Sequence, residues 1–92
     1  AHSEAWIAER AANALRHEGS DLRRAAQLAE QAVVAEPRSV SYRVTLGEIY
    51  FDAGMLARAA GEVERALAMS PDDPRAGALS RLIAKRKRES KA

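Results

Sequence analysis

The chain has 92 residues, the size of one small domain, and a net charge of +2. It contains no Cys, which excludes a disulfide framework, a thiolate nucleophile and a Cys-based zinc site. No apolar run approaches the roughly 18–20 residues of a membrane span, and the charged, amphipathic start AHSEAWIAER is unlike a signal peptide, so a cytoplasmic location is favoured.

Five helices are expected, because Ala, Leu, Glu and Arg dominate and runs of β-branched residues are absent. Capping residues and helix breakers place them at residues 3–17, 21–35, 39–53, 56–69 and 73–87. Ser3 and either Ser20 or Asp21 are candidate N-caps, Gly19 and Gly54 follow helix ends, and Pro37 and Pro71 stop the second and fourth helices. Short connections between such helices predict antiparallel neighbours.

The chain contains an internal repeat with a period of 34 residues. When residues 21–37, DLRRAAQLAEQAVVAEP, are aligned with residues 55–71, MLARAAGEVERALAMSP, seven of 17 positions are identical. The identical pairs are Leu22 and Leu56, Arg24 and Arg58, Ala25 and Ala59, Ala26 and Ala60, Glu30 and Glu64, Ala32 and Ala66, and Pro37 and Pro71. A fixed step of this length is typical of stacked helical repeats.

Residues 40–73 resemble the tetratricopeptide (TPR) repeat, a helix–turn–helix unit of 34 residues. The residues that carry the resemblance are Leu46, Gly47 and Tyr50, then Gly54 at the turn, Ala59 and Ala66, and Pro71. Arg43 stands where the family usually has Trp, and residues 6–39 keep only Ala25, Ala32 and Pro37 of the pattern. The resemblance implies an all-α fold in which antiparallel helical hairpins stack as a short right-handed α-solenoid of five helices.

One domain, residues 1–92, would then contain repeat one at 6–39, repeat two at 40–73 and a capping helix at 74–88. Gly47 is expected where a neighbouring helix leaves no room for a side chain, since glycine inside a helix otherwise costs about 0.5–1 kcal/mol relative to alanine. The capping helix is expected to cover the open edge of repeat two with Leu79, Leu82 and Ile83.

Residue types that carry chemistry are scarce. His2 and His17 lie 15 residues apart without a metal-ligand spacing, and Asp72 and Asp73 are expected to be turn and cap residues. No phosphate-binding loop or catalytic triad pattern is present, so we expect a non-enzymatic protein without cofactor, metal or small-molecule substrate.

The C-terminal segment concentrates positive charge. From Arg81 onward six basic residues stand against Glu89, a local charge of +5 that leaves −3 for the rest of the chain. Residues 85–92 are expected to be a basic, frayed tail, either solvated or in contact with an acidic partner. The tail has no aromatic residue, so nucleic-acid binding is not favoured.

In the family that the chain resembles, the first helix of each pair lines an inner, concave face that binds a peptide or protein. The residues expected on this face are Ile7, Arg10, Ala14, His17, Thr45, Glu48, Phe51, Asp52, Arg75 and Lys85. Phe51 either faces this groove as an apolar anchor or packs against the last helix and completes the core. Trp6 is expected either to pack on the first helix or to be partly exposed as an interface anchor.

The sequence thus predicts an interaction module for a protein or peptide partner of unknown identity. An exposed aromatic beside Arg10, Arg75 and Lys85 would suit a segment with an apolar anchor and acidic neighbours. The alternatives are a self-association element, since two repeats are fewer than the three usually needed for stability, and a basic-tail tether to an acidic partner.

Overall fold

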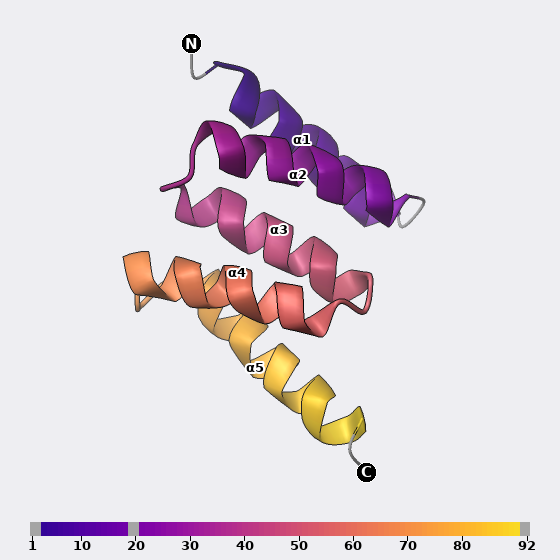
Figure 1. Ribbon diagram of the computed structural model, residues 1–92, viewed down its shortest axis with the longest axis vertical. Coiled ribbons are helices and arrows are strands. Elements are labelled where there is room, and N and C mark those ends of the chain that lie inside the picture. The colour runs from indigo at the N-terminus through magenta and orange to yellow at the C-terminus, as the bar shows by residue number, and fades with distance from the viewer. Residues whose placement is uncertain (1–2, 19–20, 91–92) are drawn as a thin grey trace.

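A computed structural model describes residues 3–18 and 21–90, which form five α-helices and no strand (Figure 1). The helices are α1 (Ser3–Glu18), α2 (Leu22–Ala35), α3 (Val40–Asp52), α4 (Leu56–Met69) and α5 (Pro74–Ser90). Each helix runs back along the preceding one, as Figure 1 shows. The predicted all-α solenoid of helical hairpins is confirmed, and the expected helix boundaries differ from the observed ones by three residues at most.

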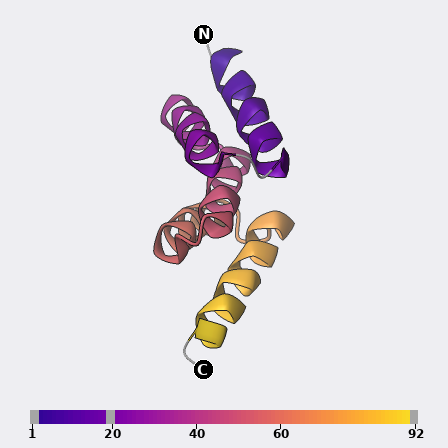
Figure 2. The same ribbon diagram turned by 90° about the vertical axis from the view of Figure 1, so that its right-hand side faces the viewer.

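The helices form two layers joined by α3. Figure 2 shows α1 and α5 on one side of α3, and α2 and α4 on the other. The closest packing is within the pairs α1–α2 and α3–α4, while α2 packs on α3 and α5 packs on both α4 and α3. We call the side formed by α1, α3 and α5 the inner face and the side formed by α2 and α4 the outer face.

Side-chain caps fix where three helices begin. The carboxylate of Asp21 accepts a hydrogen bond from the backbone N–H of Arg24 at 3.0 Å, and the carboxylate of Asp73 accepts one from Ala76 at 2.9 Å. The hydroxyl of Ser39 accepts from the N–H of Tyr42 at 3.1 Å. Gly54, between α3 and α4, has φ +79, a conformation that favours glycine because it has no Cβ.

Small residues bring the helices together. Gly47, Ala59 and Ala66 are buried, as are Ala25 and Ala29 in the first hairpin. Larger side chains fill the space around these residues: Val33, Val44, Leu46, Ile49, Tyr50, Val63, Leu79 and Ile83. The core therefore runs through both hairpins and into α5, as stacking of the repeats requires.

Arg43 shows how the chain replaces the aromatic residue usual at this position of the repeat. Its Nε donates to the carbonyl of Pro37 at 3.0 Å, and its Nη1 lies 3.0 Å from Oε1 of Glu62. The half-buried guanidinium thus connects the α2–α3 turn to α4, where an aromatic ring would have supplied apolar area instead.

Two expectations for α5 are wrong. The helix extends through Ser90, so residues 85–90 are helical rather than frayed, with Lys87 and Arg88 in the last turn, where cations complement the helix dipole. Leu79 and Ile83 are buried as expected, but Leu82 is 50% exposed. Leu82 lies seven residues after Arg75 and therefore shares the inner side of α5 with it.

Candidate functional site

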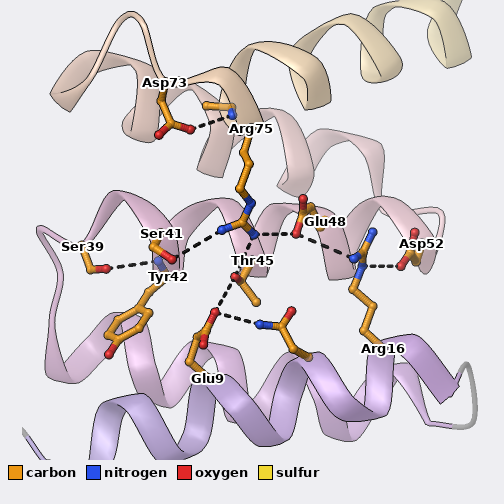
Figure 3. A network of polar contacts seen from close by, with 12 residues as sticks. Glu9, Arg16, Ser39, Ser41, Tyr42, Thr45, Glu48, Asp52, Asp73 and Arg75 are labelled. Carbon is orange, nitrogen blue, oxygen red and sulfur yellow. Dashed lines mark hydrogen bonds and ion pairs between the residues drawn. The ribbon is translucent and has the colours of Figure 1, made fainter.

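A network of polar side chains connects α1, α3 and α5 across the inner face (Figure 3). Its centre is Thr45 on α3, which is completely buried. The Thr45 hydroxyl donates to Oε1 of Glu9 at 2.9 Å and accepts from Nη2 of Arg75 at 3.2 Å. The same Glu9 oxygen accepts a second hydrogen bond, from Nδ2 of Asn13 at 2.8 Å. One hydroxyl group therefore joins the first and last helices of the fold.

Glu48 extends the network by pairing with arginines from two helices. Its Oε1 is 2.8 Å from Nη2 of Arg75 and 3.8 Å from Nη1 of Arg16. The Nε of Arg16 also donates to Oδ2 of Asp52 at 2.7 Å. No buried side-chain polar atom among the described residues lacks a hydrogen-bond partner. The polar side chains between α1, α3 and α5 thus satisfy one another's hydrogen-bonding groups.

The structure brings together four of the predicted site residues: Thr45, Glu48, Asp52 and Arg75 (Figure 3). Thr45 is buried within the network, so the expectation that it lines an open groove is wrong. Their partners on α1, which are Glu9, Asn13 and Arg16, were not predicted from the sequence. The spacing of these three residues, i, i+4 and i+7, would have placed them on one face of α1.

Phe51 does not project freely over the inner face. Its side chain is half-buried against the core, and the guanidinium carbon of Arg86 lies 4.7 Å from the ring centroid. The alternative in which Phe51 packs against the last helix is therefore the one observed. Lys85, the expected basic neighbour, is exposed, and it is Arg86 that lies over the ring.

The solvent side of α1 presents the remaining predicted residues. Ile7 is 53% exposed, and Arg10 and Ala14 are exposed. Trp6 is 49% exposed, so it is a surface residue rather than a packed one, and its ring lies 5.9 Å from the guanidinium carbon of Arg10. His17 belongs to α1, but its side chain lies outside the described residues.

Tyr50 anchors α3 to α2 on the outer side of the fold. Its hydroxyl donates to Oε2 of Glu30 at 2.5 Å. Burial, and then the hydrogen bond and the negative charge of Glu30, raise the pKa of the Tyr50 phenol to about 12. At neutral pH the phenol therefore keeps its proton and remains a donor to the carboxylate.

The described part of the chain contains neither a candidate metal cluster nor a candidate membrane-spanning helix. Among the described side chains of residues 3–18 and 21–90, no group of three or more His, Cys, Asp or Glu could hold a metal ion. In the same ranges, no helix combines the length and apolar character needed to cross a membrane.

The comparisons with known proteins agree with the geometry. A family model for the tetratricopeptide repeat matches residues 15–83, which is 69 of the 92 residues. Among curated proteins and among solved structures, no match to this chain is found. The match covers α2, α3 and α4 in full, the last residues of α1 and the part of α5 up to residue 83, so it includes Gly47 and the helices that meet there. The chain belongs to the tetratricopeptide repeat family, whose members are protein–protein interaction modules.

Proposed function

We propose that the inner face binds an acidic segment of a partner protein that carries an apolar anchor residue. The observation that supports this most directly is a pair of arginines, on the first and last helices of the inner face, that are placed over aromatic rings: Arg10 over Trp6 on α1, and Arg86 of α5 over Phe51 of α3. A guanidinium that uses its flat face on a ring keeps its in-plane N–H donors for a carboxylate.

The charges of the inner face favour recognition by these two arginines rather than by the polar network around Thr45 and Glu48. Arg16 and Arg75 already pair with Glu48, and Arg16 also pairs with Asp52. Neither Arg10 nor Arg86 forms an ion pair with another residue of the described chain. An acidic ligand would thus meet two unpaired cations without first breaking an internal salt bridge.

Apolar surface lies next to both arginines. Trp6 and Ile7 are half-exposed on α1, and Leu82, one helical turn before Arg86, is half-exposed on α5. Partly exposed aromatic and aliphatic side chains beside arginine are typical of residues that dominate binding energy at interfaces. The partner segment would place an aliphatic or aromatic side chain against one of these positions and carboxylates against the arginines.

Selection from a random peptide library on the immobilised protein tests the proposal. Enriched peptides should combine Asp or Glu with a bulky apolar residue, and the Arg10→Gln/Arg86→Gln double variant should bind them at least about 10-fold more weakly. The matched control is Arg38→Gln, an exposed arginine of the α2–α3 turn. Peptides that bind the double variant as tightly as the unmodified protein would place recognition elsewhere.

Self-association is the second candidate. A cavity of about 230 Å³ between α4 and α5 is lined by Ala60, Val63, Leu67, Ile83 and Ala84 among other residues, and it leaves apolar surface uncovered at the end of the stack. We propose that a second copy can cover it. A mass from light scattering that stays near 10 kDa as the concentration rises would refute this candidate.

A further inference from the structure

A concave site lies on the outer face of the molecule. It is a pocket of about 370 Å³ between the first half of α2 and the α3–α4 turn, and we call it the outer pocket. Its volume falls within the range of about 300–1,000 Å³ in which proteins bind small groups. Its apolar lining comes from Leu22 and Ala26 of α2 and from Ala53 and Met55 of the turn.

The inner wall of the outer pocket is fixed by the contact between Tyr50 and Glu30. The phenol donates to the carboxylate at 2.5 Å, and both residues line the pocket. This pair holds the aromatic ring in place and uses the donor of the phenol, so the ring contributes an apolar surface. Met55, by contrast, is 39% exposed at the rim and has a flexible side chain that can adapt to an inserted group.

Two arginines provide the positive charge of the outer pocket. Arg23 and Arg58 both line it, and neither makes a side-chain hydrogen bond or an ion pair with another residue among those described. The guanidinium carbon of Arg58 lies 6.0 Å from the centroid of the Tyr50 ring, which leaves the edge of the guanidinium for an anion. The only carboxylate in the lining, Glu30, already accepts the Tyr50 hydroxyl.

The backbone at this rim adds to the preference for an anion. Helix α4 begins at Leu56, next to Met55, and no side chain caps its N-terminus. Side chains do cap α2, α3 and α5. The first N–H groups of α4 therefore remain free to meet a negative group held by Arg58.

From this arrangement we infer that the outer pocket is a second binding site, which accepts one aliphatic or aromatic side chain of an acidic segment of a partner polypeptide. The apolar lining receives the side chain, and Arg23 and Arg58 pair with carboxylates on either side of it. A polypeptide is favoured because the pocket opens beside the exposed residues Arg23 and Met55, so that an inserted side chain can stay attached to a chain that crosses the outer face.

Nuclear magnetic resonance titration with a short probe tests the inference. The probe is the peptide acetyl-Glu-Leu-Asp-amide, and its neutral counterpart acetyl-Gln-Leu-Asn-amide tests the need for charge. Binding of the acidic probe should give saturable shifts of the backbone amides of Leu22, Ala26, Ala53 and Met55. The neutral probe should bind about 3- to 10-fold more weakly.

Variants then separate this site from the rest of the surface. Arg23→Gln and Arg58→Gln should each raise the dissociation constant of the acidic probe about 3- to 10-fold, while Arg24→Gln, next to Arg23 but outside the lining, should not change it. Ala53→Trp fills the rim and should abolish the saturable shifts. The thermal unfolding midpoint of the Ala53→Trp variant shows whether its fold is retained. If the fold is lost, the two Gln variants still test the inference.

The outcome is independent of the function proposed for the inner face. Loss of binding in Arg10→Gln/Arg86→Gln, with shifts centred on Thr45 and Glu48, would overturn the inference and assign the probe to the inner face. Equal affinity for the acidic and neutral probes, or the absence of saturable shifts, would overturn it as well. Binding that is weakened by Arg58→Gln and unaffected by the inner-face double variant would support it.

Discussion

Gly47 of α3 lies directly against Leu79 of α5, so closely that a Cβ on Gly47 would be 3.1 Å from Cδ2 of Leu79. The same Cβ would be 3.5 Å from Cβ of Glu62 and 3.6 Å from the backbone oxygen of Ala59, both in α4. Three helices therefore meet at one position without a side chain. The sequence predicted that one neighbouring helix would leave no room for a side chain here. In the structure two helices, α4 and α5, lie against Gly47.

Because α4 and α5 both pack against Gly47, a larger side chain at this position should destabilise the fold. Gly47→Leu should lower the free energy of unfolding by about 1–3 kcal/mol, because the added atoms must displace Leu79 and part of α4. Urea unfolding measures the change. The matched control is Gly61→Leu in α4, where a Cβ would meet only Nη1 of Arg65, at 3.5 Å, and where the gain in helix propensity should leave stability equal or higher.

Gly54 predicts a second, conformational effect. Its φ of +79 is strained for a residue with a Cβ, although nothing lies within 4 Å of the position that a Cβ would take. Gly54→Ala should therefore destabilise the protein by about 1–2 kcal/mol, and Gly54→Asn by less, because Asn tolerates the left-handed region better. A thermal midpoint of Gly54→Ala at or above that of the unmodified protein would contradict this explanation.

We expect the hydroxyl of Thr45, rather than the volume of its side chain, to hold the inner-face network together. Thr45→Val keeps the shape but leaves Glu9 and Arg75 without their shared partner, and it should cost about 1–2 kcal/mol of unfolding free energy. Ser41→Ala removes only the 3.4 Å contact with Arg75 and should stay within about 0.5 kcal/mol. Equal effects of the two substitutions in chemical denaturation would show that the Thr45 hydroxyl contributes no more than an exposed one.

The raised pKa of Tyr50 leads us to expect that the folded protein loses stability in alkaline solution. In the unfolded chain its phenol loses a proton near the ordinary tyrosine pKa of 10.0, whereas in the folded protein the pKa is raised to about 12. The folded state binds this proton more tightly, so the stability linked to Tyr50 is complete below pH 10 and is lost between pH 10 and pH 12.

The phenolate absorbance of a Tyr42→Phe variant reports Tyr50 alone, because the chain has two tyrosines. In that background Glu30→Gln should lower the pKa of Tyr50, since the charge of Glu30 raises it. A titration curve of Tyr50 that does not move when Glu30 is replaced would contradict the assigned cause.

The repeat step allowed most of the fold to be predicted. Identities at a spacing of 34 residues, caps such as Asp73, and breakers such as Pro37 and Gly54 are local signals, and α4 was predicted with its observed bounds. The end of α5 was not predicted, because a run of cations resembles a fraying end in sequence. In the fold, the helix dipole and the packing of Ile83 support the last turns.

The candidate site was less accessible to prediction. The helical face of Glu48 and Arg75 could be inferred from periodicity, but their pairing depends on how α5 crosses α3, which no local pattern specifies. Phe51 and Trp6 illustrate the same limit: each had two interpretations that differed only in whether another helix covers the ring. Arg86 covers Phe51, whereas Trp6 is half-exposed beside Arg10.

The sharing of Glu48 between Arg16 and Arg75 has a mechanical consequence. The two arginines come from the first and last helices, so a single carboxylate helps to set the distance between the two walls of the inner face. Loss of the Arg75 pair, as in Arg75→Gln, would free α5 from Glu48, while Arg16 would still hold α1 to α3 through Asp52. The spacing between α1 and α5 would then change, and with it the curvature of the stack.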